Sequence, residues 1–351
     1  MSTLNPNFFS YLLKKKNPLG KLSKSEEKEM WHIAKDFLYS GFLLDSISFG
    51  KTNLKLKNKL EIHNKAFFIN YLLMKKSLIE IAKTFNEKKI SFVVLKGMAL
   101  NIEKIYKPGI RQHRDIDLLV KKEDIKKAYE ILRKLNFRYA NSNTSDNASY
   151  LFKHHLPPMI NKLGITLELH WRVTEIDLFE SCPLTNFIFK KKKECNIMKG
   201  IFIPNLECLM AHSIYHGIKH HNFDQGPIFL FDLAAIHKFN SYKWPKNENL
   251  IKNLGLYEEY KKCKKIISIA HEKNKFSKEV QELIKEVLGN FNWKLKKQEK
   301  IKIFSSLKEK NSLKNLLKKI SIKINATSHL YQLPKTSFRY WIYFFRDLII
   351  S

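Results

Sequence analysis

Two carboxylates stand one residue apart at the start of an apolar run: Asp115 and Asp117, followed by Leu118-Leu119-Val120. On a β-strand, residues i and i+2 point to the same face, so we expect both carboxylates to project together. Two such charges repel and raise each other's pKa unless a cation lies between them. Mg²⁺ prefers hard oxygen ligands and also binds phosphate oxygens. The pair therefore predicts a metal site; the plain alternative is a strand start with solvated acids.

A third carboxylate is expected, because many phosphoryl-transfer enzymes hold the reacting oxygens between two metal ions about 3.5–4 Å apart. Glu168 is a lone acid in the apolar run LELHWRV, and His170 shares its face if that run is a strand. We predict that Asp115, Asp117 and Glu168 bind Mg²⁺, or alternatively Mn²⁺, and are the catalytic residues. Glu168 and His170 should then face the same side of the sheet as the two aspartates.

Basic residues and a glycine near these acids suit the phosphates of a nucleotide. Lys96 and Gly97 end the run ISFVVLKG where a helix begins, and helix starts bind phosphates through backbone N–H groups. Arg111 and Arg114 come just before the acidic pair and suit phosphate clamping. We predict that these four residues bind the nucleotide. The alternative is that the lysine and both arginines are ordinary solvated residues.

Histidines and a further acid are candidates for the acceptor side of a cleft. His212, His216 and His220 recur every four residues along a predicted helix. We prefer core packing to a zinc site for them, because two full turns separate the outer pair. Asp232 lies inside the apolar run FLFDLAAI and needs a partner, either one of these histidines, a lysine or an arginine. Our acceptor-side candidates are His170, His216 and Asp232.

The composition indicates a folded, strongly basic protein. The chain has 351 residues, of which 44% are hydrophobic, and a net charge of +31. This charge invites polyanionic partners, but the lysines spread along the whole chain, so we attribute most of the excess to compositional bias. Cys182, Cys195, Cys208 and Cys263 form no C-x-x-C pair, which indicates reduced thiols. No signal peptide or apolar run of transmembrane length is present, so we expect a cytoplasmic protein.

A small α/β unit between helical regions must position these residues. Residues 1–88 and 201–351 have mostly helical periodicity, and residues 89–200 predict the order strand-helix-strand-helix-strand-strand. The first two strands are ISFVVLKG and DIDLLV. The other two lie in HHLPPMINKLGITLELHWRV, one before and one after its Lys-Leu-Gly turn. We expect the amphipathic C-terminal run FRYWIYFFRDLII to pack in the core rather than on a membrane. The predicted fold is α/β of the α+β kind, a minimal mixed sheet with large N- and C-terminal helical extensions.

The segments VVLKGMAL, RQHRDIDLLV and LELHWRV together resemble the uncharacterised bacterial nucleotidyltransferases related to the DNA polymerase β superfamily. That superfamily has a glycine-containing turn after its first strand, an acidic h-D-h-[DE]-h strand and a third acid on a later strand. The resemblance covers about residues 60 to 240 and gives Gly97, Asp115, Asp117 and Glu168 those roles. Lys96-Gly97 replaces the usual Gly-Ser turn, so no serine is available there to touch the phosphates.

The resemblance implies a metal-dependent enzyme that transfers a nucleoside monophosphate from an NTP such as ATP to a hydroxyl group and releases pyrophosphate. It leaves open whether the acceptor is RNA, a protein, or a small molecule or glycan. The alternative is a non-catalytic nucleotide- or RNA-binding protein that uses the same scaffold, with the positive charge supplying the affinity.

Overall fold

The structure is a computed structural model that describes residues 6–140, 154–174, 183–220, 226–241, 243–244 and 248–288, without the side chains of residues 6, 219 and 220. Three sequence-based expectations lie outside these residues. They concern Cys182, the side chain of His220 and the C-terminal run FRYWIYFFRDLII.

A mixed five-stranded sheet carries the acidic residues, with the strand order β3-β4-β7-β6-β5. The strands are β3 (Phe92–Val94), β4 (Asp115–Val120), β5 (Arg138–Tyr139), β6 (Met159–Ile160) and β7 (Thr166–His170). β4 pairs parallel with β7, and the other neighbouring strands are antiparallel. The predicted mixed sheet is therefore confirmed, but the predicted order of elements lacks the short strand β5 between α5 and β6.

The two central strands have one apolar and one polar face. Ile116, Leu118, Leu167 and Leu169 are fully buried on the apolar face. Because side chains alternate along a strand, the intervening residues of β4 and β7 point to the opposite face. All the acids of the two strands, Asp115, Asp117 and Glu168, lie on that second face. The alternation thus turns an ordinary buried strand pair into a platform for charged residues.

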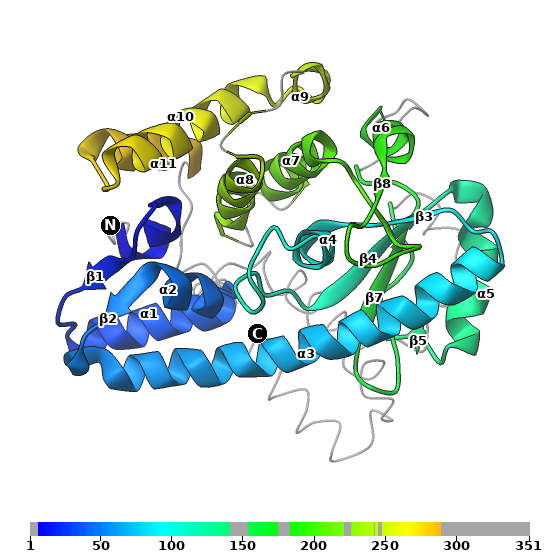
Figure 1. The fold of residues 1–351 in the computed structure, drawn as a ribbon, viewed down its shortest axis with the longest axis horizontal. Helices are drawn as coiled ribbons and strands as arrows, with labels where there is room; N and C mark the ends of the chain where they lie inside the picture. Colours follow the sequence, from blue (N-terminus) through cyan, green and yellow to red (C-terminus); the bar gives the residue numbers. More distant parts are fainter. Residues whose placement is uncertain are drawn as a thin grey trace, which may run out of the picture.

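Three helices precede the sheet: α1 (Lys24–Asp36), α2 (Ser40–Ser46) and α3 (Leu54–Glu87). Ser23 and Glu26 form a capping box at the start of α1, in which each side chain accepts a hydrogen bond from the other residue's backbone N–H. The long helix α3 contacts α1 and α2 near one end and α5 (Ile125–Lys134) near the other (Figure 1).

The periodicity predicts helices for the N-terminal region, but the structure also contains two short strands there. β1 (Asn17–Leu19) and β2 (Ile47–Phe49) form a small parallel sheet between and before the helices. The segment Ile47-Ser48-Phe49 combines a β-branched and an aromatic residue, which suits a strand. A three-residue strand is too short to disturb the apolar periodicity of the surrounding helices, so the pattern conceals it.

The remaining helices and short strands complete the fold around the sheet, and most of them come after β3 in the sequence. α4 (Lys96–Ile102) begins directly after β3, as predicted, and α7 (Leu206–Ile214) packs against α8 (Ile228–Phe239). The other elements are the 3₁₀ helices η1 (Pro6–Leu12), η2 (Lys51–Asn53) and η3 (Lys122–Asp124), α6 (Pro183–Lys191), β8 (Lys193–Glu194), β9 (Phe202–Ile203), the π-helix η5 (Tyr215–His220), α9 (Asn249–Asn253), α10 (Tyr257–Lys273) and α11 (Lys278–Leu288).

One hydrophobic core joins the sheet to both helical regions, from Phe8 near the N-terminus to Leu288 at the end of α11. Cys195, Cys208 and Cys263 are buried free thiols, as predicted. Within the described ranges, no helix combines the length and the hydrophobicity needed to cross a bilayer. The chain therefore has an α+β fold in which helices from both ends of the sequence surround a minimal sheet.

Candidate active site

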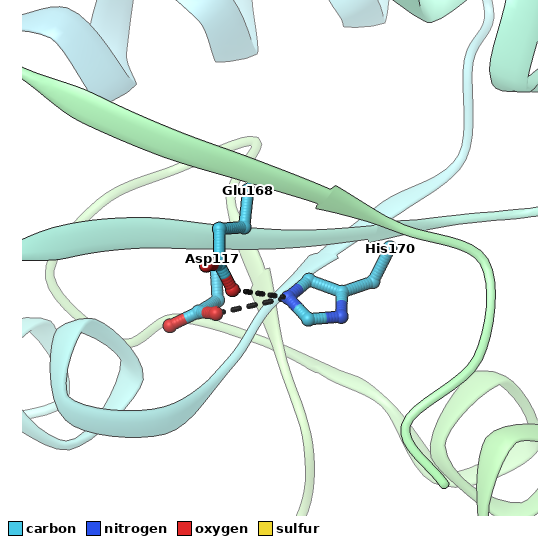
Figure 2. Close-up of side chains that lie close together, drawn as sticks. All are labelled: Asp117, Glu168 and His170. Atoms are coloured by element: carbon cyan, nitrogen blue, oxygen red, sulfur yellow. Dashed lines mark hydrogen bonds and ion pairs between the residues drawn. The ribbon is translucent and has the colours of Figure 1, made fainter. Parts of the chain in front are cut away.

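Three ionisable side chains converge on the polar face of the sheet. The parallel register of β4 and β7 sets Asp117 opposite Glu168 and Leu119 opposite His170. His170 Nε2 lies 2.9 Å from Asp117 Oδ1 and 3.4 Å from Glu168 Oε2, so its N–H points between the two carboxylates (Figure 2). One possible ligand atom from each residue lies within 4.8 Å of the other two. The predicted common face of Asp117, Glu168 and His170 is therefore confirmed.

Lys96 brings a further charge to this group from the start of α4. Its Nζ lies 2.7 Å from Asp117 Oδ1 and 3.7 Å from Glu168 Oε2. The backbone φ of Lys96 is 49°, in the left-handed region that costs a non-glycine residue about 1–2 kcal/mol. The turn between β3 and α4 thus holds the lysine in a strained conformation while its ammonium group neutralises both carboxylates.

The protonation states of this group follow from burial and mutual contact. Burial raises the pKa of Asp117, but Lys96 and His170 outweigh it and hold that pKa well below its usual range. The pKa of Glu168 is also lowered, because its hydrogen bond from His170 and the charge of Lys96 outweigh burial. Burial lowers the pKa of Lys96 and of His170, and the carboxylates reverse this and raise both. The carboxylates thus favour the protonated forms of Lys96 and His170, and these two side chains in turn favour the ionised carboxylates.

Asp115 lies two residues before Asp117 on the same face of β4, opposite Thr166. It is half-buried and lines a cavity, but it does not belong to the group formed by Asp117, Glu168 and His170. Burial and the Asp117 carboxylate raise the pKa of Asp115 to about 7. A role for Asp115 as a metal ligand stays a prediction.

The group formed by Asp117, Glu168 and His170 could hold a metal ion. Its two carboxylates supply the oxygen ligands that Mg²⁺ and Mn²⁺ prefer, and imidazole nitrogen is a common ligand of transition metals. The ammonium of Lys96 contacts the same carboxylate oxygens, which indicates that this position demands positive charge. The residues therefore fit a bound cation, although the donor set does not select one metal.

A cavity of about 180 Å³ lies beside these carboxylates, between the sheet and the helices α7 and α8. On the sheet side it is lined by Lys96, Gly97, Asp115 and Asp117. Glu168 and His170 are not among the described residues that line the cavity. Asp117 therefore belongs both to the cavity lining and to the group that it forms with Glu168 and His170.

Gly97 allows a close approach at the strand-to-helix turn. A Cβ atom at this position would lie 3.0 Å from His113 Cβ and 3.2 Å from His113 Cγ. His113 is buried, and its Nδ1 accepts a hydrogen bond of 3.1 Å from Asn101 Nδ2. Burial, reinforced by Arg111, lowers the pKa of His113 to about 4, so the ring is neutral. The glycine therefore serves packing here, and its contact with nucleotide phosphates stays a prediction.

Arg111 is held by Asp232, the buried acid of α8. Its Nε donates to Asp232 Oδ1 at 2.9 Å and its Nη2 donates to Asp232 Oδ2 at 3.2 Å. The Tyr106 hydroxyl donates to the same Oδ1 at 2.6 Å. Of the partners considered for Asp232, an arginine is therefore the one found. Both Arg111 and Asp232 line the cavity, as does the exposed Arg114.

The helical wall of the cavity includes His212, Ser213 and His216. The expected regular spacing of the histidines is wrong, because α7 ends at Ile214 and a π-helix follows. The rings of His212 and His216 nevertheless remain neighbours, and both residues line the cavity. His212 is buried and His216 is half-buried, and the preference for packing over a zinc site stays a prediction.

Sequence reasoning placed His170 on the acceptor side, whereas the structure buries its ring against the carboxylates with 1% of the side chain exposed. The ring also lies near His154 and His155, with centroid distances of 5.5 Å and 5.0 Å. Sequence reasoning missed Ser213 and His113 as cavity residues. The position of His113 between the two arginines of RQHRD was the available signal.

A family model described as an uncharacterised nucleotidyltransferase matches residues 26–263, a range that includes every residue of the site above. No curated protein matches the sequence.

Proposed function

The chain belongs to this family of uncharacterised nucleotidyltransferases, and from that premise we propose that it transfers a nucleoside monophosphate from an NTP to a hydroxyl group. One observation carries the proposal: the parallel register of β4 and β7 brings Asp117 and Glu168 together around a cation, with a phosphate-sized cavity beside them. A strand pair that served only as a scaffold would gain nothing from burying Asp117 beside a second, half-buried carboxylate.

Asp117, Glu168 and His170 are the residues that would hold a divalent metal ion, and Asp115 is a further candidate ligand from the cavity side. When bound, Mg²⁺ or Mn²⁺ would withdraw charge from the phosphate oxygens. Lys96 contacts the same carboxylates and is near enough to the cavity to give its charge to a phosphate instead.

The transfer is a substitution at the α-phosphorus of the NTP. The acceptor hydroxyl oxygen forms a bond to that phosphorus, and the bond from the phosphorus to the α,β-bridging oxygen breaks. Pyrophosphate leaves with the electron pair of the broken bond. Glu168, the more exposed of the two paired carboxylates with 19% against 2% of the side chain, takes the proton of the hydroxyl group. Lys96, Arg111 and Arg114 hold the phosphates.

A second candidate function rests on the charge of +31, which favours association with RNA. In this alternative the sheet binds a nucleotide or serves only as a scaffold, and the carboxylates do no chemistry. Its affinity would then depend on lysines distributed over the surface, and not on the residues of the site.

Calorimetric titration of each NTP, with and without Mg²⁺, separates the two candidates. We expect one or more NTPs to bind only in the presence of Mg²⁺. Asp117→Asn, which keeps the shape of the side chain but removes its charge, should abolish this binding. The exposed Glu123→Gln is the matched control and should bind as the wild type does.

NTP binding that Asp117→Asn leaves unchanged would contradict the proposal. So would tight RNA binding at low salt, independent of Asp117 and Glu168, by a protein that binds no NTP.

A further inference from the structure

The wall of the cavity opposite the acids presents three hydrogen-bonding side chains from one helical segment. His212 and Ser213 belong to α7, and His216 belongs to the π-helix that continues it. Lys96, Gly97 and Asp115 line the same cavity from the sheet side. Whatever ligand fills this space therefore touches the β3–α4 turn and the histidine wall together.

The π-helix is built into this wall by close packing. A Cβ atom on Gly217 would lie 2.7 Å from the ring of Phe229, so only glycine allows α8 to approach the π-helix so closely. Gly217 and Phe229 also line the cavity. The rings of His212 and His216 meet edge to face with centroids 5.9 Å apart. A π-helical turn is uncommon and often marks a functional site, and this one fixes where His216 stands.

The size of the cavity decides how much of a nucleotide it takes. Sites for whole drug-sized ligands measure roughly 300–1,000 Å³, and this cavity of about 180 Å³ is smaller. It suits a chain of phosphate groups, with the nucleoside outside it. Lys96, Arg111 and Arg114 line the cavity together with four aspartates, of which Asp117 pairs with Lys96 and Asp232 with Arg111. The exposed Arg114 is the cation with no ion pair among the described residues, and it suits a phosphate group.

The position of Glu168 separates the two substrates. In the proposed reaction Glu168 takes the proton of the acceptor hydroxyl, and Glu168 does not line the cavity. Glu168 contacts Lys96 at the edge of the cavity, so an acceptor that reaches Glu168 leaves the interior of the cavity to the phosphates beyond the α-phosphate.

We propose that His212, Ser213 and His216 bind the β- and γ-phosphates of the NTP, and hence the pyrophosphate that leaves, and that they do not bind the acceptor. This inference rests on the proposed function and adds to it the residues that recognise the leaving group. Imidazole N–H and hydroxyl groups donate hydrogen bonds to phosphate oxygens, and hydrogen bonds to charged groups are the stronger ones.

Binding measurements with inorganic pyrophosphate, an NTP and the matching NMP, each in the presence of Mg²⁺, test the inference without any acceptor. We expect His216→Ala to weaken pyrophosphate and NTP binding about tenfold or more and to leave NMP binding unchanged. His216→Gln keeps an N–H donor and should recover part of the affinity. The exposed His32→Ala on α1 is the matched control and should change none of the three affinities.

Unfolding temperatures show whether each variant is folded. If His216→Ala does not fold, Ser213→Ala at the half-buried Ser213 is the second variant. Equal loss of NMP and pyrophosphate binding, or no loss of either, overturns the inference while leaving nucleotidyl transfer intact. A wild-type protein that binds neither pyrophosphate nor NTP overturns the proposed function and this inference with it.

Discussion

At the scale of single residues, the site depends on how charge is balanced around Asp117. This carboxylate is almost fully buried, with 2% of its side chain exposed, and it contacts Lys96 and His170. A buried carboxylate without a partner is strongly unfavourable, so the folded state requires a cation here. Lys96 supplies it in spite of its left-handed backbone. On the proposed function, a metal ion would meet the same electrostatic requirement that the Lys96 ammonium meets here.

Replacing Lys96 by methionine tests this requirement. Methionine is unbranched, is only one atom shorter than lysine and shares the backbone strain, so Lys96→Met removes mainly the charge. Without metal, the variant should lose about 3–5 kcal/mol of unfolding free energy, as other buried pairs do when one partner is removed. Excess Mg²⁺ should restore more stability to the variant than it adds to the wild type, because the ion binds the folded state. Thermal and urea unfolding, with and without Mg²⁺, measure both effects.

Lys104→Met is the matched control, because Lys104 also has a positive φ, 59°, and is exposed. It should change stability little and show no special response to Mg²⁺. Equal responses of the two variants to Mg²⁺ would contradict the view that Lys96 occupies a cation position.

The sequence predicts the faces of these residues better than their contacts. The two-residue period of a strand is enough to put Glu168 and His170 on the face of Asp117. It does not give the rotamer by which the His170 ring turns back toward both carboxylates. The strand period also does not predict that the Lys96 side chain turns toward Asp117, because that orientation depends on the strained turn before α4.

At the scale of elements, the site depends on two pairings that are distant in sequence. β4 and β7 are parallel neighbours separated by α5, β5 and β6, and their register alone sets Asp117 beside Glu168. The strand pattern predicts that both strands exist, but not that they are adjacent or in this register. The sequence also does not predict the π-helix after α7 or the close approach of Gly217 to Phe229 on another helix.

The second pairing joins α8 to the segment before β4. Asp232 on α8 accepts hydrogen bonds from Arg111 and from the Tyr106 hydroxyl, and all three side chains are largely buried. This link fixes α8 against the sheet side of the cavity. The sequence marks Asp232 as an acid that needs a partner, but several cations were equally available to it by sequence alone.

Tyr106→Phe tests the strength of this link without creating a cavity. It removes one hydrogen bond to a buried carboxylate and should lower the free energy of unfolding by about 1.5–3 kcal/mol. The control is Tyr129→Phe, a half-buried tyrosine whose hydroxyl makes no hydrogen bond among the described residues. Urea denaturation measures both. A change for Tyr106→Phe no larger than that of the control would show that Arg111 alone satisfies Asp232.

At the scale of the whole molecule, the helical regions do more than extend the sheet. The cavity is lined by Asp36 and Phe37 near α1, by the sheet, and by α7 and α8, so distant parts of the chain enclose it. Composition and periodicity predict helices at both ends but not which of them reach the site, because that depends on tertiary packing. The uniform spread of lysines also conceals the site, where the informative charges are a few acids.

The transfer of labelled nucleotide tests the central claim most directly. Each NTP, labelled with ³²P in either its α- or its γ-phosphate, is incubated with the protein, Mg²⁺ and separate RNA, protein and small-molecule fractions as acceptors. We predict that the wild type transfers the α-label to one fraction and releases the γ-label in pyrophosphate. Asp117→Asn should catalyse neither the transfer nor the release. Entry of γ-label into an acceptor, or transfer of α-label by Asp117→Asn as fast as by the wild type, would contradict nucleotidyl transfer at this site.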